Sequence, residues 1–114
     1  MRVYLPLTLD LLAEFDAAGS VPATVDRIVA EDESEEAEYA ALMTAADASA
    51  ELQSGTGAGS GRRVVLAADV VELAGVVPKK KWAAVHVDTE DDADPDDDLA
   101  WYGIQEISEL LAGR

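Results

Sequence analysis

The chain has 114 residues, with 24 acidic side chains against 8 basic ones and a formal net charge of −16 at pH 7. This length fits one domain over residues 1–114, because a chain of this size can bury about two-thirds of its unfolded surface in a single core. The negative charge argues against nucleic acid and against an anionic membrane as partners. A hydrophobic content of 49% excludes global disorder.

The cellular location is inferred from signals that the sequence lacks. There is no cysteine, which excludes a disulfide framework and a zinc site built from thiolates. Asp10 and Glu14 interrupt the apolar N-terminal segment before it reaches the length of a signal-peptide core. No stretch of sequence approaches the roughly 20 apolar residues of a membrane span. We therefore expect a cytoplasmic protein.

The first part of the chain predicts a strand, a helix and a second strand. Residues 2–5 have the composition of a short strand, which we expect Pro6 to end because proline cannot donate to a sheet ladder. Thr8 is the expected N-cap of the helix that follows, and Gly19 stands where a helix commonly ends. Residues 21–29 are rich in β-branched side chains and predict a second strand.

A long helix is predicted over residues 34–53. Its carboxylates lie in the first turns, where the positive end of the helix dipole favours them. The Gly/Ser-rich segment 54–61 predicts a flexible connector, and no Lys-Ser/Thr pair follows its glycines as a phosphate-binding loop would require. The stripe that we expect to face the sheet has helical spacing and consists of Tyr39, Leu42, Met43, Ala46 and Ala50.

Two further strands are predicted in the second half of the chain. Residues 63–68 have the apolar composition of a buried strand. Residues 83–88 alternate, so that Val85 and Val87 face one way and the residues between and after them face the other. The pattern of residues 69–77 does not decide between an extension of the strand, a reversal and a helical turn.

An acidic loop is expected at residues 89–98, and the segment after it admits two interpretations. Residues 99–102 fit a strand, with Gly103 as the N-cap of a final helix that ends at Gly113. A continuous helix from Leu99 fits as well, because a glycine inside a helix costs only about 1 kcal/mol.

The order of the predicted elements indicates the fold class. Helices and strands alternate early in the chain, and strands cluster late. This order predicts an α+β fold, a single-domain two-layer sandwich in which helices pack on one mixed β-sheet. The order of the strands in the sheet cannot be derived from the sequence.

Several short segments carry a resemblance to known sequences. They are the opening Met1-Arg-Val-Tyr-Leu-Pro6, Glu38-Tyr-Ala-Ala-Leu42, Arg63-Val-Val-Leu-Ala-Ala-Asp69, Ala84-Val-His-Val-Asp88 and the closing Trp101-Tyr102 with Glu106. Together they resemble a family of small uncharacterised actinobacterial proteins, a domain of unknown function. The resemblance implies a bacterial cytoplasmic protein of unassigned role, and it transfers no catalytic residue.

One group of residues could form a polar site. His86 and Asp88 are two apart on a predicted strand, so an imidazole and a carboxylate could lie side by side, as in a general base with its orienting acid. Tyr102 is the third candidate for this site. The sequence shows no serine on a nucleophile elbow and no cysteine, so we expect no catalytic residue and lean against an enzyme. A histidine on the half-buried face of a strand is the plainer interpretation.

The acidic loop has the spacing of a calcium ligand set at Asp92, Asp94, Asp96 and Asp98. The EF-hand pattern fails, because Asp97 stands where that loop has glycine and Gly103 stands where it has a bidentate glutamate. These aspartates are therefore weak candidates for a divalent cation, and we expect neither a dedicated metal site nor a cofactor.

The charge distribution gives the functional hypothesis. More than half of the carboxylates lie in two clusters, residues 31–38 and 88–98. We expect a small acidic protein that acts by binding another protein, with a basic protein as the candidate partner. The alternatives are an enzyme with a polar site around His86 and Asp88, a cation-binding regulator that uses the Asp-rich loop, and an acidic surface that only prevents aggregation. The oligomeric state is left open.

Overall fold

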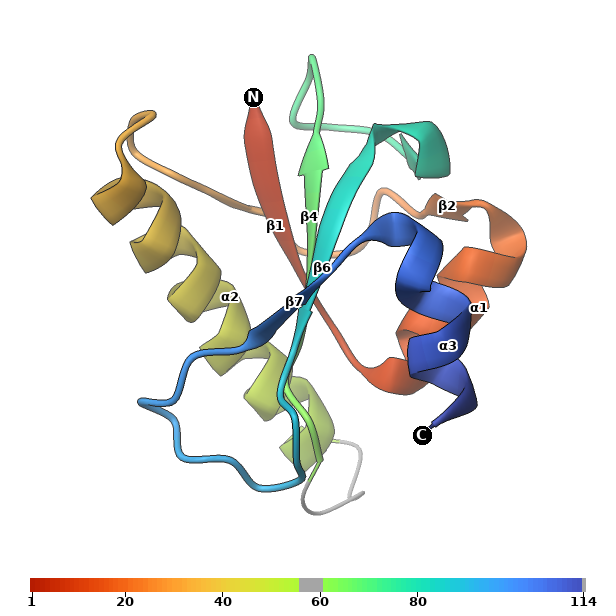
Figure 1. Ribbon diagram of the computed structural model, residues 1–114. Coiled ribbons are helices and arrows are strands. Elements are labelled where there is room, and N and C mark those ends of the chain that lie inside the picture. The colour runs from red at the N-terminus through yellow and green to blue at the C-terminus, as the bar shows by residue number, and fades with distance from the viewer. Residues whose placement is uncertain (56–60, 114) are drawn as a thin grey trace.

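Strand β4 lies at the centre of a five-stranded sheet in the computed structural model, which describes residues 1–55 and 61–113 (Figure 1). The strand order is β3-β1-β4-β6-β7, and each neighbouring pair is antiparallel. The strands are β1 (Arg2–Leu7), β3 (Ile28–Val29), β4 (Val64–Asp69), β6 (Trp82–Val87) and β7 (Ala100–Tyr102). A separate two-stranded sheet pairs β2 (Ser20–Val21) with β5 (Val77–Pro78).

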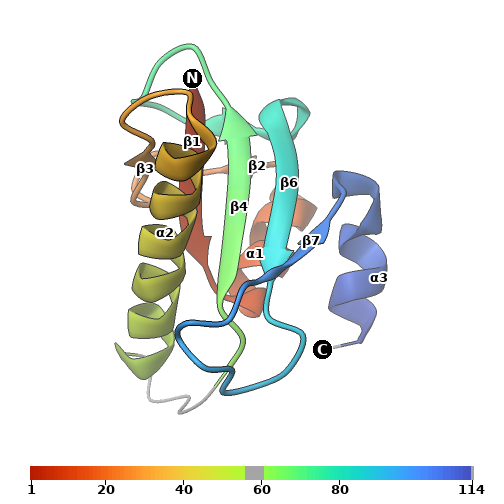
Figure 2. The same cartoon turned by 60° about the vertical axis from the view of Figure 1, so that its left-hand side comes forward.

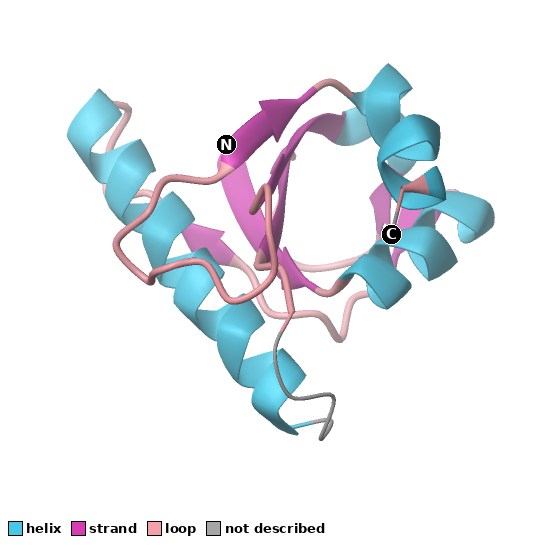
Figure 3. Ribbon diagram, turned by 60° about the horizontal axis from the view of Figure 1, so that its bottom comes forward, coloured by secondary structure: helices cyan, strands magenta, loops and turns pink. Residues whose placement is uncertain are grey.

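Helices cover both faces of the large sheet. Helix α2 (Glu35–Gly55) lies on one face, and α1 (Leu9–Ala18) and α3 (Ile107–Ala112) lie on the other (Figures 2 and 3). Two short 3-10 turns, Lys79–Lys81 and Ile104–Glu106, precede β6 and α3. No helix in the described part of the chain has the length and apolar content that a membrane span requires.

The two faces of the sheet carry different cores. The face toward α1 and α3 is built from branched side chains such as Leu5, Leu66 and Val85, all fully buried. The face toward α2 is built mostly from alanines, together with Tyr4 and Val65, and Ala45 and Ala46 of the helix are fully buried against it. Small side chains let a helix approach a sheet closely, which explains how a chain with only 5% aromatic residues fills this layer.

The α+β class is confirmed, with two differences in detail. The sheet is antiparallel in all of its described pairings and not mixed. Helices lie on both of its faces, so the arrangement has three layers and not two. The burial of β4 explains the second difference, because residues 64–68 are all buried and an inner strand that is apolar on both faces needs cover on both.

Two expectations about the N-terminal strands were wrong. Strand β1 continues through Pro6 to Leu7, because β3 pairs only with Val3 and Tyr4, so Pro6 has a strand neighbour on one side only. The strand predicted at 21–29 is instead two short strands in different sheets, β2 and β3, separated by a turn. β-branched composition alone does not show where a chain leaves one sheet for another.

The two long helices were predicted correctly. Thr8 caps α1 by accepting a hydrogen bond from the Leu11 N–H at 3.1 Å, and Gly19 ends the helix with φ = 81°. Helix α2 begins one residue later than predicted, and Ser34 Oγ accepts from the Ala37 N–H at 3.1 Å. The predicted stripe is only partly correct, because Tyr39 and Ala50 are exposed and the buried face is made of Ala41, Ala45, Ala46 and Ser49.

Of the two interpretations of the C-terminal segment, the structure shows the strand and not the continuous helix. Ala100–Tyr102 pairs with β6, and the Gly103 N–H donates to Glu106 Oε1 at 3.0 Å at the start of the final helical segment. The predicted connector at 54–61 lies largely outside the described residues.

Candidate functional site

The acidic loop, residues 89–98, connects β6 to β7 and is attached to the body through Arg63. This residue precedes β4, and its side chain is buried together with that of Asp88, at exposed fractions of 6% and 2%. Arg63 Nε donates to Asp88 Oδ2 and Arg63 Nη2 to Asp88 Oδ1, each at 2.8 Å. The Arg63 backbone N–H also donates to Asp88 Oδ2 at 2.8 Å. The geometry is the bidentate fork that arginine makes with a carboxylate.

The rest of the Arg63 guanidinium binds the backbone of the acidic loop. Nη1 donates to the carbonyl oxygen of Pro95 at 3.0 Å, and Nη2 donates to those of Asp94 at 3.2 Å and Asp97 at 2.9 Å. One buried cation therefore gathers three loop carbonyls. The carboxylates of Asp94 and Asp97 are left on exposed residues at the surface of the loop.

The environment of Arg63 favours its charged form. The pKa of Arg63 lies above its ordinary value, first because of the hydrogen bonds to Asp88, and burial opposes this effect. A buried charge is tolerated where it is paired and where its remaining hydrogen-bonding groups are satisfied. Both conditions hold at this site, since no buried side-chain nitrogen or oxygen lacks a partner in the described part of the chain.

A second contact joins the acidic loop to α2. The Tyr39 hydroxyl donates to Asp98 Oδ1 at 2.7 Å, across 59 residues of sequence. This hydrogen bond is the main reason why the pKa of Tyr39 is raised. The loop is thus held at its centre by Arg63 and near its end by Tyr39.

After the acidic loop, the exposed indole ring of Trp101 lies on the edge strand β7 of the sheet. Trp101 is 64% exposed and lies on β7, opposite His86 of β6. Figure 2 shows β7 at the side of the sheet away from β3, with the acidic loop leading directly into it. An exposed tryptophan next to a fixed group of carboxylates is a candidate contact for a cationic partner.

The three residues of the predicted polar site are not brought together. His86 lies opposite Trp101, whereas Tyr102 lies opposite Val85 and so points to the other face of the sheet. The carboxylate of Asp88 is bonded to Arg63. His86 is half-buried, and its pKa is lowered, first by burial and then by the charge of Arg2.

The candidate cation ligands in the acidic loop do not converge either. Asp94 Oδ1 accepts the Asp96 N–H at 2.9 Å, and Asp98 binds Tyr39. Asp92 has a positive φ of 58°, where it reverses the chain. Within residues 1–55 and 61–113, no three acidic or histidine side chains are grouped as a metal site would need.

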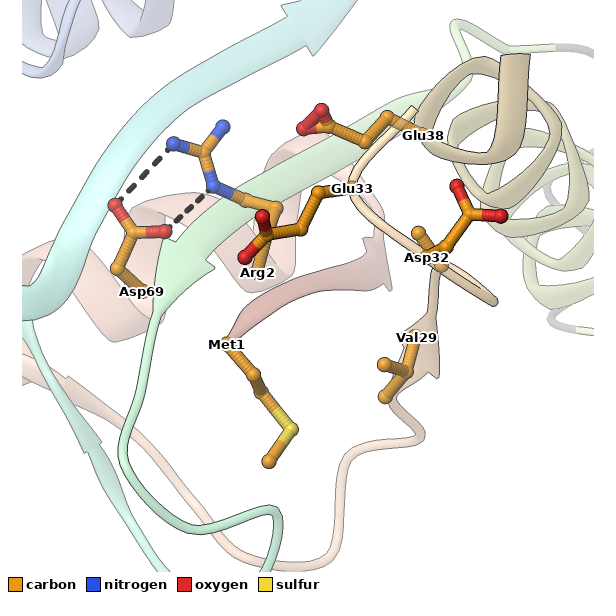
Figure 4. Close-up of a pocket in the computed structure, with 8 residues that line it drawn as sticks. Met1, Arg2, Val29, Asp32, Glu33, Glu38 and Asp69 are labelled. Atoms are coloured by element: carbon orange, nitrogen blue, oxygen red, sulfur yellow. Dashed lines mark hydrogen bonds and ion pairs between the residues drawn. The ribbon is translucent and has the colours of Figure 1, made fainter. Parts of the chain in front are cut away.

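A separate hollow of about 410 Å³ lies at the opposite end of the sheet, between β1 and the start of α2 (Figure 4). Arg2 Nε donates to Asp69 Oδ1 at 2.7 Å and Nη2 to Oδ2 at 3.2 Å. The Arg2 guanidinium lowers the pKa of Asp69. In Figure 4 the carboxylates of Glu33 and Glu38 also point toward Arg2. The hollow contains one arginine, whose charge is neutralised by Asp69, and several further acidic residues. This set of side chains does not indicate a particular class of ligand.

A family model, described as a family of unknown function (DUF6912), matches residues 1–96. The chain belongs to DUF6912. Neither the comparison with curated proteins nor the comparison with solved structures gives a significant match. The expected membership in a family of unknown function is confirmed, whereas the actinobacterial source stays a prediction.

The part of the chain that matches DUF6912 includes both members of the buried ion pair. Arg63, Asp88 and the loop carbonyls of Asp94 and Pro95 all lie within it, and β7 with Trp101 follows it. The match thus covers the acidic loop up to Asp96, while Asp97 and Asp98 lie just beyond it.

Sequence reasoning identified the acidic loop but not the residue that holds it. Arg63 appeared only as the first residue of a predicted strand. A basic residue directly before an apolar strand, in a chain with few basic residues, is the signal that could have drawn attention to it. Its partner Asp88 stands in the sequence at the start of an acidic cluster and two residues after His86, and neither position indicates a pairing with Arg63.

Proposed function

We propose that this protein acts by binding another protein and that the acidic loop receives a basic surface of that partner. The observation that supports this proposal is the anchoring of the loop by Arg63, which binds three of its backbone carbonyls from a buried position. A loop whose backbone is already fixed loses less conformational entropy on binding than a free acidic segment would.

The charge of the whole chain supports the same conclusion. With a net charge of −16, the protein attracts cationic surfaces and repels anionic ones over distances set by the salt concentration. Charge complementarity acts mainly on the rate of association and on the choice of partner. We therefore expect binding that weakens steeply as salt is added.

Two of the three alternatives, the enzyme and the cation-binding regulator, have less support, and the third, an acidic surface that only prevents aggregation, predicts no captured partner. An enzyme would need His86, Asp88 and Tyr102 in one site, but Tyr102 points to the other face of the sheet and the Asp88 carboxylate is bonded to Arg63. A cation-binding regulator would need converging carboxylates in the acidic loop. We place the protein in the cytoplasm of an actinobacterium, because its cysteine-free composition fits a reducing compartment and because of the sequence resemblance described above.

Two variants with the same net charge test this proposal. The first neutralises exposed carboxylates of the acidic loop, Asp92→Asn, Asp96→Asn and Asp97→Asn. The second neutralises the same number of exposed carboxylates elsewhere, Glu14→Gln, Asp26→Asn and Glu72→Gln. Proteins captured from an actinobacterial lysate are compared at about 0.01 M and about 1 M salt, where the Debye length falls from about 30 Å to about 3 Å.

The expected result is a partner that is captured at low salt by the unmodified protein and by the second variant, and that is lost with the first variant. The unmodified protein and the second variant should both lose this partner at high salt. Equal capture by both variants would show that the acidic loop is not the contact, and no captured partner at either salt concentration would contradict the proposal as a whole.

A further inference from the structure

The outer edge of β7 is not paired with another strand in the described part of the chain. β7 is the last strand in the order β3-β1-β4-β6-β7. The opposite edge strand, β3, is only two residues long and is packed against α2. Unpaired edges are templates for an added strand, and proteins commonly protect them. β7 instead carries Trp101, one of the most exposed large apolar side chains of the described residues.

The main-chain groups of Trp101 point away from the sheet. The Asp88 N–H donates to the Arg63 carbonyl at 3.1 Å, so the main chain of Asp88 faces β4. The direction of the main-chain N–H and C=O groups alternates along a strand. Those of His86 therefore also point toward β4, whereas those of Val85 and Val87 point toward β7. Their partners Tyr102 and Ala100 face back toward β6. Trp101 lies between them, and its N–H and C=O therefore point outward.

Acidic groups and an aromatic ring lie on both sides of this edge. On the α2 side lies exposed Trp101, which is three residues after the last aspartate of the acidic loop, Asp98. On the other side, a hollow of about 260 Å³ is lined by Tyr102 and by the acidic residues Glu106 and Glu109, together with Arg62, Leu110 and Gly113. Side chains of an added strand would point alternately to these two sides.

We infer that an extended basic segment of the partner protein pairs with the outer edge of β7, with one cationic side chain over Trp101 and the next near Glu106 and Glu109. The inference rests on the proposed function and specifies where and how the partner binds. Main-chain hydrogen bonds to Trp101 supply pairing that does not depend on sequence. Arginine or lysine over an indole ring supplies the preference for a cation.

Charge argues against a second copy of this chain as the occupant. Two copies joined at β7 would bring two acidic loops together, and each chain carries a net charge of −16. Like charges at an interface oppose association by several kcal/mol. A basic segment meets the opposite condition, because the carboxylates on both sides of β7 attract it.

The test uses a short peptide in which adjacent arginine and lysine residues are flanked by threonines, so that consecutive basic side chains point to the two sides of the added strand; it is titrated into the ¹⁵N-labelled protein. A peptide with glutamate in place of the basic residues is the control. We expect the basic peptide alone to shift the amide and indole signals of Trp101 and to slow hydrogen exchange of the Trp101 amide. Trp101→Ala should weaken binding about tenfold, which corresponds to about 1.4 kcal/mol for the cation–π contact, and Trp101→Phe should restore part of it.

Trp101→Pro separates main-chain pairing from the ring contact. It removes the outward N–H as well as the indole, so it should weaken binding beyond Trp101→Ala. Shifts confined to the acidic loop, with β7 unaffected, would overturn this inference and leave the proposed function in place. The absence of any shift would count against both. A dimer that dissociates in Trp101→Ala would assign the edge to a second copy and overturn the inference.

Discussion

Arg63 and Asp88 form a bidentate ion pair across the start of β4 and the end of β6, and both side chains are almost fully buried. The same guanidinium holds the acidic loop through carbonyls of Asp94, Pro95 and Asp97. The pair therefore links the stability of the sheet to the position of the charged surface that we propose as the binding site.

Replacing Asp88 by asparagine should destabilise the protein by about 3–5 kcal/mol, because it leaves the charge of Arg63 buried without its counter-ion. Urea denaturation of both proteins, with m-values compared, measures the difference. The double variant Arg63→Met with Asp88→Leu should recover a large part of this loss, because no buried charge remains. A loss below about 1 kcal/mol in Asp88→Asn would show that the buried pair is not a stabilising contact.

The ion pair of Arg2 with Asp69 is the matched control. It has the same bidentate geometry, but the side chains are 37% and 60% exposed. Exposed pairs contribute about 0–1 kcal/mol, so Asp69→Asn should change the free energy of unfolding by no more than this. A comparable loss in both variants would mean that burial does not account for the difference between the two pairs.

The elements with local signals could be predicted from the sequence. Helix α1 is bounded by Thr8 and Gly19, whose capping roles depend only on neighbouring residues, and β4 is a continuous apolar run. The course of residues 21–29 could not be predicted, because it depends on pairing with β1 and β5, which are distant in sequence.

For the candidate site, the sequence shows which residues make up the acidic loop but not which residues hold the loop in place. The acidic loop is visible in the sequence, but Arg63 reaches Asp88 across 25 residues and the loop carbonyls across more than 30. The position of Arg63 before an apolar strand can draw attention to this residue, but a single sequence does not show which distant groups it contacts. The same holds for Tyr102, since two neighbouring strand residues point to opposite faces and only the register shows that His86 faces Trp101.

His86 should give the protein a pH-dependent stability between about pH 7 and pH 5. Its pKa in the folded state is lowered by burial and by Arg2, so below the ordinary value near 6.5 the unfolded chain binds the proton more readily. Stability is therefore fully present above that value and decreases as the pH falls through the folded-state pKa. Denaturant midpoints across this range, in the unmodified protein and in His86→Gln, measure the effect.

His86→Gln removes the only imidazole that titrates in this pH range, because the chain has one histidine. It should have a flatter profile over the same range, since carboxylates titrate mainly at lower pH. An NMR titration of the imidazole gives the folded-state pKa directly. A value above 6.5, or identical profiles for the two proteins, would contradict the assignment.

Ser49 should be a stabilising residue although it lies within a helix. Its hydroxyl donates to the Leu7 carbonyl at 2.6 Å and accepts from the Val64 N–H at 2.9 Å, and it is fully buried. It thus joins α2 to the paired ends of β1 and β4. Ser49→Ala should cost about 1–3 kcal/mol, because two buried main-chain groups lose their partner. Chemical denaturation tests this value, with Ser108→Ala, an exposed serine on α3, as the control.

The melting temperature should rise as salt is added at low ionic strength. The net charge of −16 destabilises the compact state by repulsion among carboxylates, and this repulsion is screened as the Debye length falls from about 30 Å at 0.01 M to about 10 Å at 0.1 M. Thermal unfolding followed by circular dichroism in sodium chloride measures the slope. The loop variant with Asp92, Asp96 and Asp97 neutralised should have a smaller slope. A melting temperature that falls with salt would indicate that attractive ion pairs, such as that of Arg2 with Asp69, outweigh the repulsion.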